Sequence, residues 1–217
     1  MKLIVTGATG NAGSAVVHEA LLDPDVTKVT VVSRRPLGTK HEKLDVILHE
    51  DFTDWTSLRS KLEGHDAMIW CLGIAQGKVS REEYERITYD YAVAAAKMLS
   101  EINPKMRLCF LSGSGADSKE KSFILFARVK GRAENELMRI LPSTWCFRAG
   151  HIVPLDERPD RSLGERFFDA IAPSLRVLSK NIMIEAEVLA RALIRVAKRG
   201  DVEQHVLENV AIVELGK

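Results

Sequence analysis

The stretch KLIVTGATGNAG, residues 2–13, decides the fold of this chain of 217 residues. Its first part, Lys2 to Thr6, is an apolar run typical of a buried parallel strand. Three closely spaced glycines interrupt the run, and Asn11 to Leu22 continues with apolar residues at helical spacing. The stretch therefore predicts a strand, a tight turn and the start of a helix.

The glycines of this turn are Gly7, Gly10 and Gly13. A strand-to-helix turn of this kind gathers unpaired backbone N–H groups and the positive end of a helix dipole at one point, where a pyrophosphate can bind. Glycine is needed because a Cβ would obstruct both the turn and the approach of the phosphates. The alternative is a glycine-rich turn with a purely structural role; at the first strand of an α/β chain, the motif favours a dinucleotide site.

Strands and helices alternate along the rest of the chain. Further strands are predicted at Lys28–Ser33, Leu44–Leu48, Ala67–Cys71, Arg107–Ser112 and Thr144–Ala149. Helices are predicted around Trp55–Leu62 and at Ser80–Ile102, Phe123–Leu141 and Glu185–Arg199. This order predicts an α/β fold, a doubly wound parallel sheet in a single domain over residues 1–217.

Two connections stand out in this pattern. Residues 34–43 join two predicted strands but are too few for a full crossover helix, which is unusual between parallel strands. Residues 151–183 are irregular and contain Pro154, Pro159 and Pro173. Because long irregular stretches in compact domains are commonly functional, this small C-terminal segment is interpreted as a substrate lid or a subunit contact.

The composition of the chain limits the classes of partner that it is expected to bind. Lys plus Arg total 31 and Asp plus Glu total 30, a formal charge of +1, which gives no electrostatic case for binding nucleic acid or an anionic membrane. The cysteines, Cys71, Cys109 and Cys146, lie far apart without metal-ligand spacing, so buried reduced thiols and no metal site are expected. No apolar run approaches the length of about 18 residues typical of a membrane span. We expect a cytoplasmic monomer or homodimer whose partners are a nucleotide and an unidentified small molecule or protein.

The second predicted strand ends in Ser33-Arg34-Arg35. In dinucleotide folds, an acidic residue about 20 positions after the glycines holds the adenosine ribose of NAD(H), whereas arginine there accommodates the 2′-phosphate of NADP(H). With arginines and no carboxylate at this place, the sequence favours NADP(H). The alternative is that both arginines belong to a solvated loop.

Several motifs together resemble the atypical short-chain dehydrogenase/reductase superfamily. TGATGNAG resembles the TGxxGxxG turn of its atypical and extended branches. Further segments resemble the Tat-interacting-protein-like and NmrA-like oxidoreductases, namely Cys71-Leu72-Gly73 with Gly77-Lys78, SGSGAD at 112–117, Val129-Lys130-Gly131 and Phe147-Arg148-Ala149-Gly150. The resemblance implies an NADP(H)-binding Rossmann domain over nearly the whole chain. In the last motif, Ala149 replaces the usual proline, which puts the shape of the substrate loop in question.

The cofactor site expected from the motifs and this resemblance extends along the carboxyl ends of the strands. Asp51, at a strand end, is a candidate for the adenine amino group or for the start of the next helix, and Gly73 would let the backbone pass close to the cofactor. The residues expected at the cofactor are Gly7, Thr9, Gly10, Asn11, Ala12, Gly13, Arg34, Arg35, Asp51, Phe52, Cys71, Leu72, Gly73, Ser112 and Lys130.

The catalytic pattern implied by the resemblance is a serine after the fifth strand and a YxxxK pair on the next helix. Ser112 and Lys130 match it, but Phe126 stands in the tyrosine position. A tyrosine hydroxyl there exchanges a proton with the substrate oxygen while the lysine lowers its pKa, and a phenyl ring does neither. The remaining proton sources are Ser112, Ser114, His151, a tyrosine between 84 and 91, and water.

Two functions follow from this departure. The first is an NADP(H)-dependent oxidoreductase acting on a small carbonyl compound, in which Ser112 orients the substrate and Lys130 the nicotinamide ribose. The second is a non-catalytic NADP(H)-binding sensor or protein-interaction module, which Phe126 favours. Cofactor binding on this fold does not by itself establish chemistry.

Overall fold

A seven-stranded parallel sheet forms the centre of the molecule, with strand order β3-β2-β1-β4-β5-β6-β9. The computed structural model describes residues 1–153 and 182–217. The strands are β1 (Lys2–Thr6), β2 (Lys28–Ser33), β3 (Leu44–Leu48), β4 (Ala67–Trp70), β5 (Arg107–Leu111), β6 (Thr144–Arg148) and β9 (Val206–Glu208). The change of direction between β1 and β4 makes the sheet doubly wound, which confirms the predicted Rossmann-like fold.

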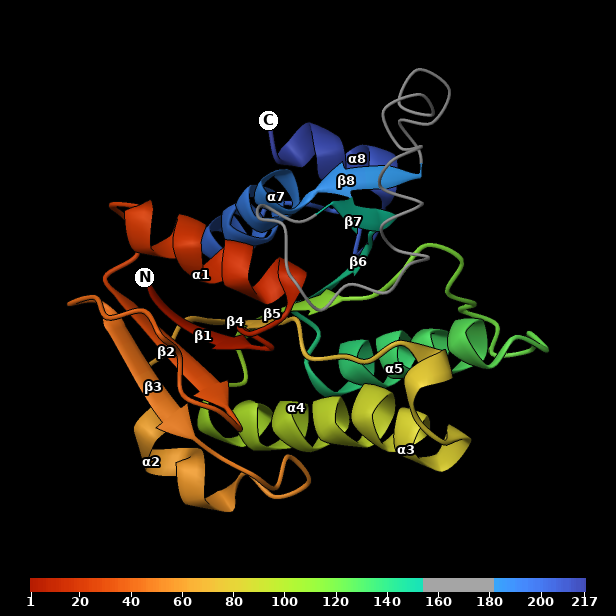
Figure 1. Cartoon of the computed structure of the whole chain (residues 1–217), viewed down its shortest axis with the longest axis horizontal. Helices are drawn as coiled ribbons and strands as arrows, with labels where there is room; N and C mark the ends of the chain where they lie inside the picture. The colour runs from red at the N-terminus through yellow and green to blue at the C-terminus, as the bar shows by residue number, and fades with distance from the viewer. Residues whose placement is uncertain (154–181) are drawn as a thin grey trace.

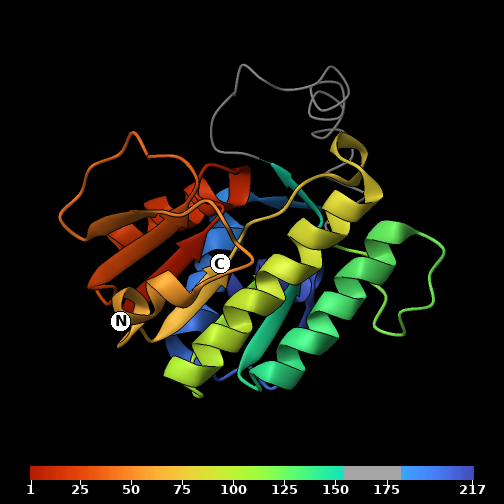
Figure 2. The same cartoon turned by 90° about the horizontal axis from the view of Figure 1, so that it is seen from below.

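Helices cover both faces of this sheet (Figures 1 and 2). On one face α1 (Asn11–Leu22) packs against α7 (Ala186–Arg199), beside the short α8 (Asn209–Leu215). On the other face lie α4 (Tyr91–Ile102), α5 (Leu125–Ile140) and the short α2 (Arg59–Leu62). β1 is buried on both sides. Leu3 and Val5 lie in the hydrophobic core beneath α1 and α7, and Ile4 lies in the core beneath α4.

The connection 34–43 contains no helix, as its length predicts, and β3 still pairs in parallel with β2, Val29 opposite Leu44. Lys43 anchors the end of this connection. Its Nζ donates to the carbonyl oxygens of Leu21 and Asp23 at 3.2 and 3.0 Å, at the C-terminus of α1. A cation there complements the negative end of the helix dipole, so one side chain ties the short connection to α1.

The helix predicted from Ser80 to Ile102 is interrupted. Ser80 caps α3 (Arg81–Glu85) by accepting from the Glu83 N–H at 3.2 Å, as the capping pattern predicts. A π-helical turn over Arg86–Asp90, labelled η3, then leads into α4. One extra residue in a turn leaves the apolar spacing nearly unchanged, so the sequence pattern alone does not reveal it.

The predicted lid, residues 151–183, falls largely on 154–181, outside the described residues. Its ends form a second sheet, in which β7 (His151–Val153) pairs in parallel with β8 (Met183–Glu185). These strands and β9 are three residues each, too short for the pattern to predict. Within the described residues, no helix combines the length and the apolar character that crossing a membrane requires.

Candidate nucleotide-binding and active site

The glycine turn between β1 and α1 has no room for side chains. Gly7 has φ +70°, and a Cβ on it would lie 2.5 Å from the carbonyl atoms of Cys71. A Cβ on Gly13 would lie 2.1 Å from the Gly7 oxygen. Gly10 caps α1 and donates its N–H to that same oxygen at 2.9 Å. At Gly7 and Gly13 the turn therefore presents only backbone near the start of α1, where helix N–H groups and the dipole favour an anion.

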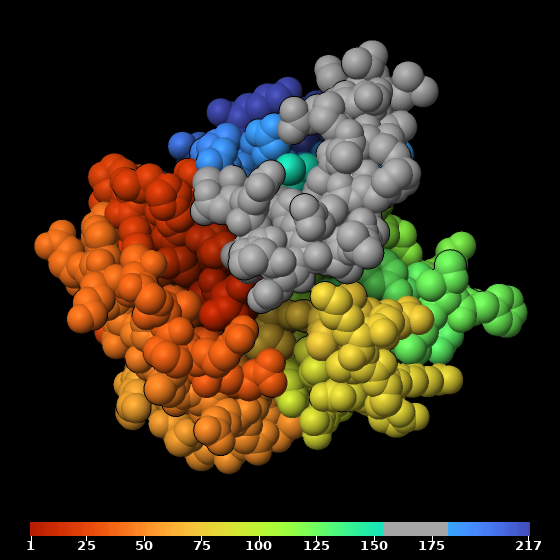
Figure 3. Space-filling view, in the orientation of Figure 1, coloured from red at the N-terminus to blue at the C-terminus, as the bar shows by residue number. Residues whose placement is uncertain are grey.

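A cavity of about 240 Å³ opens beside this turn, at the carboxyl ends of β1, β2 and β4. Its lining includes nine of the residues expected at the cofactor, together with Val32 and Ser33, which the sequence analysis did not select. The nine are Gly7, Thr9, Gly10, Arg34, Arg35, Phe52, Cys71, Leu72 and Gly73. Asn11, Ala12, Gly13, Asp51, Ser112 and Lys130 do not line it. In Figure 3 the red residues after β1 lie next to the orange residues after β2 on the molecular face.

Arg34 and Arg35 form the outer edge of this cavity, and both are exposed. The Arg35 guanidinium donates to the Thr9 hydroxyl at 3.2 Å, and its backbone N–H donates to the Ser33 hydroxyl at 3.2 Å. Thr9 belongs to the glycine turn. Two arginines thus stand beside the glycine turn, and guanidinium groups are well suited to bind a phosphate monoester.

Asp51 and Phe52 behave differently although they are neighbours. Asp51 is exposed, and its Oδ1 accepts hydrogen bonds from the hydroxyl and N–H of Thr53, which lower the pKa of the carboxyl. Phe52 is buried, packs against Trp55 and Trp70, and forms part of the cavity wall. Phe52 has no exposed surface, so its ring belongs to the packed core behind the cavity, while the Asp51 carboxylate shapes the turn after β3.

Lys130 is on α5, and its side chain reaches the carboxyl end of β5. Its Nζ donates to the Leu111 carbonyl oxygen at 3.0 Å and lies 4.7 Å from the centre of the Phe110 ring. The side chain is buried, and this burial lowers the pKa of the ammonium to about 8. Lys130 is therefore a cation that is held in place next to Ser112 and loses its charge in mildly alkaline solution.

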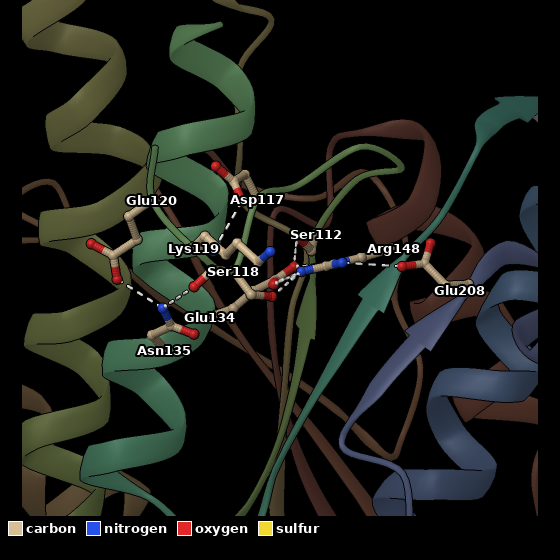
Figure 4. A network of polar contacts seen from close by, with 9 residues as sticks. All are labelled: Ser112, Asp117, Ser118, Lys119, Glu120, Glu134, Asn135, Arg148 and Glu208. Atoms are coloured by element: carbon tan, nitrogen blue, oxygen red, sulfur yellow. Dashed lines mark hydrogen bonds and ion pairs between the residues drawn. The ribbon is translucent and has the colours of Figure 1, made fainter. Parts of the chain in front are cut away.

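Ser112 is hydrogen-bonded to Glu134, which was not among the residues expected at the site. Its hydroxyl donates to Glu134 Oε1 at 2.5 Å, and Glu134 is fully buried. Arg148 donates to both oxygens of the same carboxylate, from Nε at 3.1 Å and from Nη2 at 2.6 Å. Figure 4 shows the three side chains converging from β5, α5 and β6. The Ser112 hydroxyl is therefore engaged with a buried carboxylate, and its role as a proton source stays a prediction.

Arg148 also connects this group to the surface. Its Nη2 donates to the Ser118 hydroxyl at 2.6 Å, and its Nη1 contacts Glu208 Oε1 at 3.1 Å (Figure 4). Hydrogen bonds to Glu134 are the main reason why the pKa of the guanidinium is raised. A single side chain thus joins the loop after β5 to α5 and β9.

Phe126 fills the position of the usual tyrosine. Its N–H donates to Gln76 Oε1 at 2.9 Å, and a Cβ on Gly113 would lie 2.6 Å from the far ring carbon, Cζ. The tip of the ring therefore rests against the residue after Ser112. Among the other proposed proton sources, Tyr84 is buried, which raises the pKa of its hydroxyl, and His151 is on β7.

The three cysteines are unpaired thiols, as predicted. Cys109 and Cys146 are buried, and Cys71 is half-buried in the cavity wall. Burial raises the pKa of the Cys71 thiol to about 12 and raises those of the other two as well. All three are neutral at physiological pH, so they serve as small apolar residues.

Comparison with known proteins agrees with this geometry. Residues 7–139 match the family described as NAD(P)H-binding, and the match includes the glycine turn, the cavity and most of α5. The chain belongs to the NAD(P)H-binding family. This family agrees with the motifs of the chain, and its cofactor is a nicotinamide dinucleotide.

Relatives of this NAD(P)H-binding protein span most of its length. Protein HTATIP2 of Rattus norvegicus is 28% identical over 222 residues, covering 100% of this chain and 89% of the rat protein. A Candida albicans protein named FMP52, mitochondrial, is 27% identical, and the aligned region covers 76% of this chain and 69% of the Candida protein. The solved structure of MoeE5 in complex with UDP-glucose and NAD superposes with a TM-score of 0.71 at 20% identity, covering 95% of this chain and 75% of that chain. This last likeness shows the fold alone.

Proposed function

We propose that this NAD(P)H-binding protein prefers NADP(H) to NAD(H) and reduces a small carbonyl compound. The observation that carries the cofactor preference is the position of Arg34 and Arg35 in the cavity of the glycine turn. Arg35 is tied to Thr9 of that turn, and β2 ends in Ser33 without a carboxylate to hold a ribose 2′-hydroxyl.

The residues divide the proposed ligand between them. Backbone N–H groups after Gly7 would hold the pyrophosphate, and the two arginines would bind the 2′-phosphate. Phe52 would lie at the adenine region, where Asp51 is a candidate to bind the adenine amino group. Lys130 would hold the nicotinamide ribose, because its ammonium is fixed beside the end of β5. The cofactor supplies the hydride when it is bound. The proton comes from solvent or from a group other than Ser112 and Phe126.

The alternative function is an NADP(H)-binding sensor or interaction module without catalysis. It is favoured by one observation: the Phe126 ring occupies the space over Gly113 where the family's acid or base would act. In that case the glycine turn and the arginines keep their roles, and Lys130 only anchors the ribose.

The test is a titration of the whole chain with NADPH and with NADH. We expect tighter NADPH binding, and expect Arg34→Ala combined with Arg35→Ala to weaken NADPH about 10- to 100-fold while leaving NADH nearly unchanged, because charge-assisted hydrogen bonds to the 2′-phosphate are lost. Arg195→Ala, which removes an exposed arginine of α7, is the matched control. Equal affinities for both nucleotides in the native chain would refute the preference.

The cytoplasmic location and the monomeric or homodimeric state remain predictions. The FMP52 relatives are named mitochondrial, which makes the location worth testing directly. Fractionation of cells that express the chain, with markers for both compartments, distinguishes the two, and recovery with mitochondria would contradict the cytoplasmic prediction.

A further inference from the structure

The charge of Glu134 determines what Ser112 can do. The carboxylate is fully buried and receives two hydrogen bonds from Arg148, whose guanidinium cannot lose its proton in a protein. In this bidentate ion pair, both carboxylate oxygens of Glu134 accept charge-assisted hydrogen bonds from Arg148. An ionised carboxylate only accepts hydrogen bonds.

The proton of Ser112 is therefore assigned. With its Oγ 2.5 Å from Glu134 Oε1, the hydroxyl must be the donor of this hydrogen bond. The single hydroxyl proton is then used in the hydrogen bond to Glu134, and the Ser112 oxygen can only accept a hydrogen bond from another molecule. This is the opposite of a serine that orients a substrate by donating to its carbonyl oxygen.

We propose that Glu134 is a positioning residue that makes Ser112 a hydrogen-bond acceptor toward the bound ligand, so that the site recognises a neutral N–H or O–H donor. The inference rests on the proposed function, which places the nicotinamide half of the cofactor at the end of β5, next to Lys130. Two groups there have the required chemistry: the carboxamide of the nicotinamide ring and a hydroxyl of the substrate in its alcohol form.

The experiment compares ligands that differ only in the donor. NADP⁺ carries a carboxamide with N–H groups, whereas its 3-acetylpyridine analogue carries a methyl ketone in the same place, and 2′,5′-ADP lacks the nicotinamide half. Affinities are measured for the native chain, Ser112→Ala and Glu134→Gln. Glu208→Gln is the control, since it alters another partner of Arg148 without touching Ser112.

For a carboxamide donor, we expect the native chain to bind NADP⁺ about fivefold more tightly than the acetylpyridine analogue, the effect of one neutral hydrogen bond. Ser112→Ala should abolish this difference. Glu134→Gln should shrink or reverse it, because Arg148 holds the amide oxygen, the amide N–H donates to Ser112, and the serine proton is released toward the ligand. Glu208→Gln should keep the difference, and 2′,5′-ADP should bind all four proteins equally.

For a substrate hydroxyl, the two nucleotides bind the native chain alike, and cyclohexanol, but not cyclohexanone, stabilises its NADP⁺ complex against thermal unfolding. Ser112→Ala should remove that response. The inference is overturned if the native chain distinguishes neither pair of ligands, or if Ser112→Ala still distinguishes them. Ser112→Ala keeps the Glu134–Arg148 pair, so the test stands even if Glu134→Gln fails to fold. Failure of 2′,5′-ADP to bind the native chain refutes the proposed function itself, and the inference with it.

Discussion

The glycine-turn cavity and the group of residues at the end of β5 are built in different ways. At the glycine turn, backbone geometry is decisive, because Gly7 and Gly13 admit no Cβ, and the two arginines stand on the loop that follows β2. At the end of β5, the determinants are side chains, and their partners are inside the protein. Ser112 donates to Glu134, Lys130 donates to the Leu111 carbonyl, and Phe126 rests against Gly113.

This difference separates binding from chemistry. A backbone turn keeps its geometry through many substitutions around it, so the glycine turn agrees with the family. A side-chain site changes its chemistry with one replacement, such as Phe126 for tyrosine. Variants at the glycine turn and at the end of β5 test this separation of nucleotide binding from catalysis.

The largest effect is expected from Phe126→Tyr. A hydroxyl on the ring that lies over Gly113 restores a proton donor near Ser112 and Lys130, and general acid catalysis typically contributes a factor of about 100 or more. NADPH oxidation with a panel of small carbonyl compounds measures the gain. Phe126→Leu, which adds no hydroxyl, is the control. If the native chain already turns over as fast as Phe126→Tyr, the missing hydroxyl does not limit the reaction.

Gly13→Ala should have the next largest effect, at the glycine turn. Its Cβ would overlap the Gly7 oxygen, and the displacement of the turn should weaken NADPH binding about 10- to 100-fold and lower the thermal unfolding temperature. Gly38→Ala is the matched control, because a Cβ at that exposed glycine has no atom within 4 Å. Unchanged NADPH affinity in a folded Gly13→Ala protein would argue against the phosphate site.

Lys130 predicts a pH dependence of stability. Burial lowers the pKa of its ammonium from 10.5 to about 8, so between these values the unfolded chain holds a proton that the folded chain has lost. Stability rises with pH wherever the unfolded state binds more protons. The free energy of unfolding of the native chain, relative to Lys130→Met, should therefore increase from pH 8 to pH 10, by up to about 1.4 kcal/mol per unit. Urea unfolding measures it, and parallel pH curves would disprove the shift.

The smallest effect is expected from Asp51→Ala. The carboxylate is exposed and already accepts two hydrogen bonds from Thr53, so a contact with adenine should contribute no more than about threefold to NADPH affinity. A loss larger than that of the double arginine variant would mean that the adenine contact, rather than the 2′-phosphate, determines affinity.

Local patterns made much of the fold predictable. The predicted strand Lys2–Thr6 matches β1, and the other predicted strands differ from the structure by at most one residue, because buried parallel strands are short apolar runs with sharp ends. Glu134 could not be predicted in the same way. Four residues after Lys130 on a helix, it has the sequence pattern of a surface ion pair, and only the packing of α5 against β6 brings it to Ser112 and Arg148.

The aromatic wall beside the cavity gives the protein an optical reporter of its own. Phe52 lines the cavity and lies 5.5 Å from Trp55 and 6.4 Å from Trp70, measured between ring centres. The third tryptophan, Trp145, is on β6 and stacks on His205 at 5.2 Å. A reduced nicotinamide absorbs where tryptophan emits, so binding of NADPH should quench the tryptophan fluorescence of the protein. Binding can then be followed without a label, and Trp55→Phe or Trp70→Phe would show which ring carries the signal.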